Sequence, residues 1–343
     1  MTAPRILVTG GSGFIAGHII LQLLDSGASV RATLRSLDRE SQVRATLREA
    51  GMTRDDALEF VAADLLDDAG WPATVEGVDG ALHVASPVHL GPVDDEEQVI
   101  APAREGTLRA LRAARDAGVP RIVVTSAFHA AGFGHPPLER AFTEEDWSVL
   151  DGPGMDAYGR SKVLAERAAW DVIAAEGGDT ELVTMLPVAV VGPLLGDGIS
   201  GANHLVRRVL TGELPGYPDV AVPFVDVRDV AAAHIAALTA ADAAGRRFLL
   251  TSQEDAVPLA DVGAELRAAL GDRAPRIPTA MLPSEAVRAA AESNPGMRPM
   301  AAELGYRKKV SCEKARDILG FRPRTWQEAV VAAGESMIAR GLD

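Results

Sequence analysis

The stretch TGGSGFIA, residues 9–16, most constrains the fold of this chain. It follows the short apolar run RILV and opens a segment, residues 14–28, whose apolar residues recur at helical spacing. Gly10 and Gly13 permit a tight turn and let a bound group approach the backbone, while Ala16 keeps the helix close to the strand. The helix N-terminus supplies free N–H groups and a positive dipole end. This order predicts a site for the pyrophosphate of a dinucleotide, with an ordinary glycine turn as the plainer alternative.

Strands and helices alternate beyond this loop. The strand segments are apolar runs with little polar alternation, so both faces of their sheet should be covered. Helical stretches separate them, among them a long amphipathic one at residues 98–118. The pattern predicts an α/β fold: a Rossmann-type doubly wound parallel sheet with a smaller mixed C-terminal substrate lobe. The predicted strands are residues 5–10, 29–35, 58–65, 80–87, 121–127 and 181–193.

The composition of the segments changes after Gly192. Residues 193–222 are rich in Gly and Pro, residues 222–238 return to a strand and a helix, and residues 255–310 are again irregular. We therefore expect two units. They are a dinucleotide-binding domain of residues 1–192 and 222–254, and a substrate-binding lobe with the C-terminal helices, of residues 193–221 and 255–343.

Charge and cysteine content exclude several classes of function. The net charge of −14 disfavours a nucleic-acid partner, which would require a basic face. The single cysteine, Cys312, fits a reducing compartment, and a first strand near Arg5 leaves no room for a signal peptide. No uncharged apolar run approaches the roughly 18 residues of a membrane span. The seven histidines lack metal-ligand spacing. We expect a cytoplasmic monomer or homodimer that binds a small molecule, and no membrane, nucleic acid or metal.

The end of the second predicted strand indicates which dinucleotide is bound. A cofactor without a 2′-phosphate usually meets an Asp or Glu about 20 residues after the glycine loop. This strand instead ends in Arg35, followed by Ser36 and Arg39, and a guanidinium suits a phosphate. The sequence therefore predicts NADP(H), although Arg35 could also be an ordinary surface residue in a chain of 30 arginines.

A tyrosine and a lysine carry the chemistry. Tyr158 and Lys162 are four residues apart in a helical segment, so both side chains should lie on one face. A nearby ammonium favours the phenolate and should lower the phenol's pKa towards neutrality. Lys162 is the only lysine before residue 308 in a chain that otherwise uses arginine, which argues against an incidental surface pair. We expect Tyr158 to exchange a proton with the substrate, assisted by Lys162.

These motifs together resemble the extended short-chain dehydrogenase/reductase superfamily. The segments TGGSGFIA, Tyr158-x-x-x-Lys162, HVASP, LPVAVVGP and FVDVRDVAAAH stand in its order. The chain is most similar to the branch of dihydroflavonol reductase, cinnamoyl-CoA reductase and NADPH-dependent aldehyde/ketone reductase. VRATLRS resembles the second strand of that branch, whose terminal Arg holds the 2′-phosphate, and KKVSCEKARDILGFRP resembles its C-terminal part. The resemblance covers nearly the whole chain.

The resemblance implies an NADP-dependent oxidoreductase that reduces an aldehyde or ketone to the alcohol. Hydride passes from the nicotinamide to the carbonyl carbon, Tyr158 protonates the oxygen, Lys162 holds the ribose, and a serine hydroxyl orients the carbonyl. Asp64 and Leu65 would hold the adenine, and residues 187–190 would lie along the nicotinamide. The expected cofactor contacts are Thr9, Gly10, Gly13, Phe14, Ile15, Arg35, Asp64, Leu65, Ala85, Ser86, Thr125, Tyr158, Lys162, Pro187, Val188 and Val190.

The fifth predicted strand ends in a sequence that departs from this branch. There the strand usually reads Thr-Ser-Ser, with the second serine catalytic, whereas here that position is Ala127. Either Ser126 supplies the orienting hydroxyl, or the serine's role is weakened and another group donates. Thr125 and His129 are the alternative donors, although an ordinary loop histidine is the more common interpretation of His129. The expected catalytic residues are Tyr158, Lys162 and Ser126.

Two other functions compete with carbonyl reduction. A nucleotide-sugar epimerase or dehydratase of the same superfamily usually holds NAD tightly and often has a Ser-Ser or Thr-Asp-Glu arrangement before Val-Tyr-Gly, which this chain lacks. Arg35 also favours a dissociable NADP(H). The second competitor is a non-catalytic NADP-binding regulator that has lost its serine. Such a regulator would need neither Tyr158 nor Lys162, and both are present.

Overall fold

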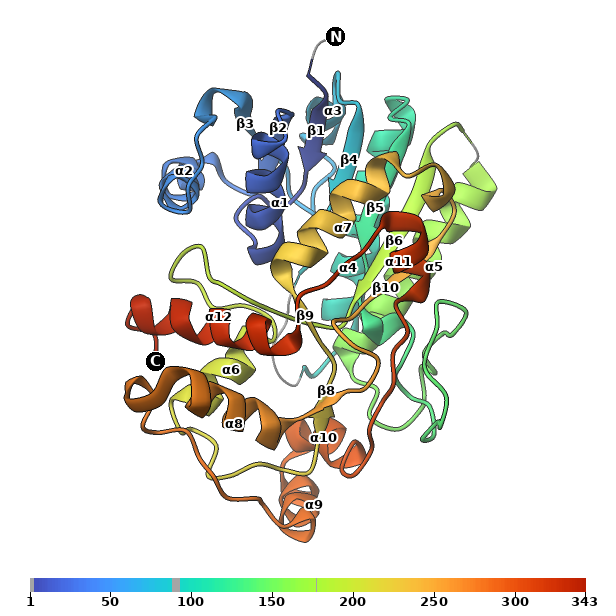
Figure 1. The fold of residues 1–343 in the computed structure, drawn as a ribbon. Coiled ribbons are helices and arrows are strands. Elements are labelled where there is room, and N and C mark those ends of the chain that lie inside the picture. The colour runs from blue at the N-terminus through green and yellow to red at the C-terminus, as the bar shows by residue number, and fades with distance from the viewer. Residues whose placement is uncertain (1–2, 88–92, 177) are drawn as a thin grey trace.

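The computed structural model describes residues 3–87, 93–176 and 178–343, and is built around one parallel sheet (Figure 1). All six pairs of neighbouring strands in this sheet run parallel, and helices flank them, so the predicted α/β fold is confirmed. Across the sheet the strands are β10 (Arg247–Leu250), β6 (Glu181–Pro187), β5 (Arg121–Thr125), β4 (Gly80–His83), β1 (Arg5–Val8), β2 (Ser29–Leu34) and β3 (Leu58–Ala62).

The strand order reverses at β1. β2 and β3 follow β1 on one side of it in the sheet. The chain then crosses to the other side of β1, where β4 lies next to it. Ile6 of β1 is paired with both Val30 of β2 and Gly80 of β4. In an open α/β sheet, the helices that follow the two central strands leave on opposite faces, which opens a crevice at the strands' carboxyl ends. That crevice lies where the glycine loop leaves β1.

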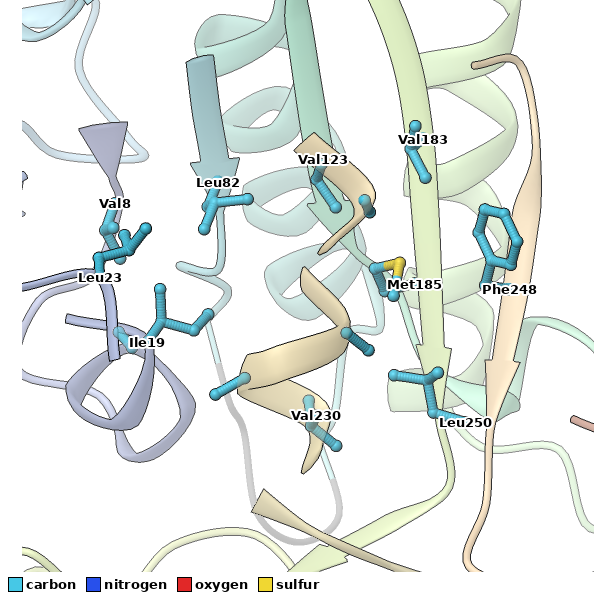
Figure 2. Close-up of a cluster of buried hydrophobic side chains, with 14 of the residues drawn as sticks. Val8, Ile19, Leu23, Leu82, Val123, Val183, Met185, Val230, Phe248 and Leu250 are labelled. Atoms are coloured by element: carbon cyan, nitrogen blue, oxygen red, sulfur yellow. The ribbon is translucent and has the colours of Figure 1, made fainter. Parts of the chain in front are cut away.

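Helices cover both faces of the sheet. On one face, α1 (Phe14–Asp25) and α7 (Val227–Thr239) pack against alternate strand residues such as Val8 and Leu82, as Figure 2 shows with Ile19, Leu23 and Val230. On the other face, α4 (Glu97–Asp116) and α5 (Ala157–Glu176) pack against the intervening strand residues, such as Leu7 and Ala81. Successive strand residues point to opposite faces, which explains the continuous apolar runs of the sequence.

A second apolar cluster lies beyond the carboxyl ends of the strands. It joins α6 (Asn203–Leu210), α8 (Leu259–Leu270) and α12 (Trp326–Ala339) around buried side chains that include Tyr217, Phe224 and Val330. Two small sheets accompany it: β7 (Ala189–Val191) pairs with β9 (Phe224–Asp226), and β8 (Ala221–Val222) with β11 (Val257–Pro258). These elements lie below the main sheet in Figure 1. The predicted division into two units stays a prediction.

Several strand boundaries differ from the sequence expectation. The strand expected over residues 181–193 is two strands, because the backbone leaves the partner Leu250 after Val188 and joins the partner Pro223 at Ala189. The edge strand β10 was not expected as a separate strand. The strand expected at the start of residues 222–238 is β9, which pairs outside the main sheet.

The remaining elements are short and lie mostly at the periphery. Within the described residues, none of the helices combines the length and apolar character that a membrane crossing requires. The remaining α-helices are α2 (Glu40–Glu49), α3 (Trp71–Val75), α9 (Ser284–Ser293), α10 (Arg298–Ala302) and α11 (Glu313–Leu319), and the 3-10 helices are η1 (Leu37–Arg39), η2 (Asp55–Ala57), η3 (Phe128–Ala130), η4 (Ala241–Ala243), η5 (Gly271–Arg273) and η6 (Pro295–Met297).

Candidate active site

The glycine loop packs directly against the end of β4. Gly10 has a φ of 71°, and its N–H donates to the Thr33 hydroxyl at 3.0 Å. A Cβ atom added to Gly10 would lie 3.0 Å from the Cα of Ala85, and one added to Gly11 would lie 2.9 Å from the Cβ of Ala32. Side chains at these positions would collide with Ala85 and Ala32, so the glycines allow the loop to pack closely against the strands.

The N-terminus of α1 presents its amides without a side-chain cap. Gly13 occupies the N-cap in an extended conformation, and the first turn carries no acidic residue. Because the Gly17 N–H makes the first helical bond, to the Gly13 carbonyl at 2.9 Å, the N–H groups of Phe14, Ile15 and Ala16 have no partner within the helix. Such amides and the positive dipole end suit an anion, so the loop fits the pyrophosphate of a dinucleotide.

Thr9 ties the two central strands together below this loop. Its hydroxyl oxygen accepts from the N–H groups of Val84 and Ala85, both at 3.0 Å, and is 3.0 Å from Nδ1 of His83. With two amides donating to the oxygen, the hydroxyl proton points to Nδ1. Burial lowers the pKa of His83 to about 3, which keeps the ring neutral for this role. Thr9 therefore fixes the crevice between β1 and β4, with its side chain already bonded.

The three side chains expected at the adenosine end follow β2 and β3. Arg35 is exposed, and none of the ion pairs among the described residues involves it, so its guanidinium is available to a phosphate. Asp64 is half-buried, and its Oδ1 accepts from the Leu66 N–H at 3.0 Å. Leu65 closes this side of the crevice against Gly106, where an added Cβ would come within 2.8 Å of it.

Tyr158 and Lys162 lie one turn apart on α5, as their spacing predicts. The ammonium of Lys162 lies 5.5 Å from the centre of the Tyr158 ring and donates to the hydroxyl of Ser86 at 2.8 Å. Ser86 follows β4 by three residues, so the lysine reaches from α5 to the end of the strand that borders the crevice. The structure thus brings the expected acid, its helper and a cofactor-contact residue together.

Burial changes the pKa of both groups. It raises the pKa of Tyr158 to about 12, with Asp156 adding to the increase, and it lowers that of Lys162 to about 8 against the opposing charge of Glu166. The spacing of Tyr158 and Lys162 predicts a lowered Tyr158 pKa, and the direction in the structure is the opposite. Desolvation of the phenolate outweighs the nearby ammonium. Tyr158 is therefore protonated at neutral pH, which is the state that a proton donor needs.

The two hydroxyls at the end of β5 are already bonded. The Thr125 hydroxyl lies 2.9 Å from Nε2 of His234, whose Nδ1 donates to the Val230 carbonyl. Ser126 is buried, and its hydroxyl donates to Oε2 of Glu166 at 2.6 Å. The same carboxylate accepts from Thr184 and from Arg247, each at 2.8 Å. A catalytic role for Ser126 stays a prediction.

The residues expected along the nicotinamide follow β6. Pro187 ends this strand opposite Leu250, and the Val188 N–H donates to the Leu250 carbonyl at 3.1 Å. Val188 is buried, whereas Val190 in β7 is half-buried. In the described part of the chain, no group of three His, Cys, Asp or Glu side chains could hold a metal ion.

Comparison with known proteins identifies the family. Residues 6–250 match the profile of the NAD dependent epimerase/dehydratase family, which is more than half of the chain. The chain belongs to this family. Cinnamoyl-CoA reductase 1 of Arabidopsis thaliana is 35% identical over 264 residues, covering 76% of this chain and 74% of the plant protein. Ketoreductase azaE of Aspergillus niger is 33% identical over 264 residues, covering 72% and 77%.

A solved structure extends the likeness to the whole fold. Gre2 of Candida albicans, solved in complex with NADPH, superposes with a TM-score of 0.79 at 25% identity, over 98% of this chain and 99% of Gre2. These relatives confirm the superfamily and the reductase branch that the sequence predicts. They also confirm that the chain is an oxidoreductase.

His129 lies beside Tyr158; the sequence offers it as an alternative donor, with an ordinary loop histidine as the favoured interpretation. It belongs to η3, directly after Ala127, where the branch usually has its catalytic serine. Its ring stacks on Phe133, with centres 4.1 Å apart and planes 9° apart, and meets the Tyr158 ring edge-on with centres 5.0 Å apart. His129 and Tyr158 are 29 positions apart in the sequence, so only the folding of the chain brings them into contact.

Proposed function

We propose that Tyr158, Lys162 and the groups around them carry out the NADPH-dependent reduction of an aldehyde or ketone to the alcohol. The observation that carries this assignment is the placement of Tyr158 and Lys162 on α5, with Lys162 bonded to Ser86 at the end of β4. This puts a proton donor and a cation beside the crevice that receives a dinucleotide. The reductase relatives and the NADPH-bound Gre2 support the same reaction and cofactor.

The cofactor-binding residues divide by the part of NADPH they would hold. The amides of Phe14 and Ile15 would bind the pyrophosphate at the N-terminus of α1, because they have no partner within the helix, and Gly13 would let it approach the backbone. Arg35 would bind the 2′-phosphate, and Asp64 and Leu65 would border the adenine. Lys162 and Ser86 would meet the nicotinamide ribose. Thr9 and Thr125 would hold the strand ends through their own bonds, and Ala85, Pro187, Val188 and Val190 would line the cleft with apolar surface.

The chemistry then divides between the cofactor and the chain. The bound cofactor supplies the hydride that reduces the carbonyl carbon. Tyr158 holds the proton that the carbonyl oxygen receives, and its raised pKa keeps that proton in place until the oxygen becomes basic. Lys162, charged near neutrality, stabilises the phenolate that Tyr158 becomes. The reverse oxidation would use the same groups in the opposite order.

An epimerase or dehydratase remains the competing assignment within the family. It would require a tightly held NAD. The exposed Arg35, which pairs with no acid among the described residues, favours the 2′-phosphate of NADPH instead. A non-catalytic regulator would have no use for the Tyr158–Lys162 pair. Both alternatives predict that purified protein does not oxidise added NADPH when a carbonyl substrate is present.

The cellular location and oligomeric state are proposed from the sequence. Its single cysteine, Cys312, is buried and unpaired, in keeping with a reducing compartment such as the cytoplasm. A monomer or homodimer is proposed, with residues 1–192 and 222–254 binding the dinucleotide and residues 193–221 and 255–343 covering the substrate.

The test follows the loss of reduced cofactor. Purified protein is mixed with NADPH or NADH and a panel of aromatic ketones, α-keto esters, aldehydes, dihydroflavonols and cinnamoyl-CoA. Oxidation of NADPH well above that of NADH supports the proposal and ranks the substrate classes. Co-purified NAD that does not exchange, with no oxidation across the panel, would instead support the epimerase assignment. Binding of NADPH without turnover would support the regulator.

A further inference from the structure

The position of the family's catalytic serine lacks a hydroxyl in this chain. Ala127, which occupies it, has an extended backbone with φ −156° and ψ 159°. Successive side chains of an extended segment point to opposite sides, so Ala127 faces away from the side that Ser126 faces. Ser126 turns to the buried carboxylate of Glu166. A methyl group therefore stands where a donor to the substrate carbonyl would be expected.

His129 is placed to supply that donor. Its ring is held by the parallel stack on Phe133 and by the edge contact with Tyr158. Among the hydrogen bonds of the described residues, none involves the His129 imidazole. The side chain is only half-buried, and neither ring nitrogen is among the buried polar atoms without a partner, so the ring still faces open space.

Burial keeps His129 uncharged. It lowers the pKa of His129 to about 4, with Asp156 opposing the decrease and Lys308 and Lys162 adding to it. Lys308 lies over the other partner of the stack, with its ammonium 3.7 Å from the centre of the Phe133 ring, and is paired with Glu303 at 2.9 Å. A neutral imidazole carries one N–H group, so it can donate one hydrogen bond, as a serine hydroxyl can.

We propose that an N–H of His129 donates a hydrogen bond to the substrate carbonyl oxygen and orients it towards Tyr158, in place of the serine that Ala127 replaces. The inference rests on the proposed function, in which Tyr158 protonates that oxygen. The carbonyl oxygen gains negative charge as hydride reaches the carbon, and a fixed donor beside it stabilises the transition state more than the ground state.

The test removes the donor and keeps the ring. His129→Phe can still stack on Phe133 but has no N–H. With NADPH and ethyl benzoylformate, its kcat and kcat/KM should both fall about tenfold or more, the usual cost of a lost transition-state donor. The Kd for NADPH and the Tm should stay near wild type. The double variant Ala127→Ser/His129→Phe should recover at least about threefold of the lost kcat, because serine restores a donor.

Two outcomes overturn the inference: a His129→Phe kcat within about threefold of wild type, or a deficit that Ala127→Ser does not relieve. If His129→Phe does not fold, His129→Leu with and without Ala127→Ser makes the same comparison. A second measurement is independent of turnover. The ¹⁵N shifts of the His129 ring should move when ethyl benzoylformate joins the protein–NADP⁺ complex, and unchanged shifts also overturn the inference.

The Tyr158→Phe variant separates this inference from the function on which it rests. If Tyr158→Phe loses turnover while His129→Phe does not, only the role of His129 fails. If Tyr158→Phe keeps wild-type turnover, the proposed function fails whatever His129 shows.

Discussion

The hydroxyl of Ser126, at the end of β5, donates a hydrogen bond of 2.6 Å to the carboxylate of Glu166 on α5. Glu166 lies one turn beyond Lys162 on that helix and also accepts from Thr184 of β6 and Arg247 of β10. The carboxylate therefore joins three strands to the helix that carries the proton donor. The serine of this strand end is part of the bond network that fixes α5 on the sheet.

Loss of the Ser126 hydroxyl should affect stability more than catalysis. Ser126→Ala removes one donor to a buried carboxylate, which costs about 1–3 kcal/mol of the free energy of unfolding. Denaturant unfolding should show this loss, whereas kcat should stay within about threefold of wild type because the hydroxyl is already bonded to Glu166. Ser126→Thr, which keeps a hydroxyl, is the matched control. A tenfold drop in kcat with normal stability would make Ser126 the orienting donor after all, as the sequence analysis expected, and would contradict the role of His129.

Neutralising Glu166 should destabilise the protein strongly. Glu166→Gln leaves Arg247 buried beside a neutral amide, and removal of one partner of a buried ion pair costs about 3–5 kcal/mol. Glu335→Gln is the control, because its pair with Arg273 is half-exposed on both sides and should be worth no more than about 1 kcal/mol. Urea unfolding compares the two. Equal losses would mean that the buried network does not stabilise the fold as described.

The glycine loop could be predicted from sequence because its signals are local. The strand RILV, the glycines and the start of α1 follow one another within about a dozen residues, and each depends only on backbone freedom and apolar periodicity. The position of Tyr158 and Lys162 on one helix face could be predicted for the same reason, since it follows from helix geometry alone.

The features that the sequence did not reveal depend on contacts between distant segments. Glu166 looked like one charged residue among many on α5, and only the meeting of β5, β6 and β10 shows it to be a buried acceptor. His129 meets Tyr158 because η3 folds back on α5. β10 has only four residues and begins at Arg247, directly after Arg246, and its pairing with β6 places it in the sheet. The rise in the Tyr158 pKa follows from burial, which a spacing argument does not include.

Arg35 should determine the preference for NADPH. Arg35→Gln removes a charged donor to the 2′-phosphate, so the Kd for NADPH should rise about tenfold or more, while that for NADH should hardly change. Arg288→Gln, an equal loss of charge on exposed α9, is the control and should change neither value. Isothermal titration calorimetry measures the Kd of each variant for NADPH and for NADH. An equal weakening of both cofactors by Arg35→Gln would argue against a contact with the 2′-phosphate.

Gly10 should be required for cofactor binding because of its close contact with Ala85, in addition to its backbone conformation. Gly10→Ala forces a side chain into a φ of +71° and into contact with Ala85 at 3.0 Å, which should displace the loop amides and raise the Kd for NADPH about tenfold. Gly118→Ala is matched in conformation, with a φ of +69°, but has nothing within 4 Å of the added Cβ. It should lose about 1 kcal/mol of stability and bind NADPH normally. Similar affinities for the two variants would refute the close approach of loop and β4.

The proton donor is the centre of the account, and one comparison tests it most directly: the rate of NADPH oxidation by wild type and by Tyr158→Phe with the best carbonyl substrate of the panel. The variant keeps the ring that contacts His129 and Lys162 and loses only the acidic proton. Its kcat should fall by about 100-fold or more, with the Kd for NADPH and the Tm unchanged. A folded, NADPH-binding Tyr158→Phe that turns over within about threefold of wild type would contradict the account.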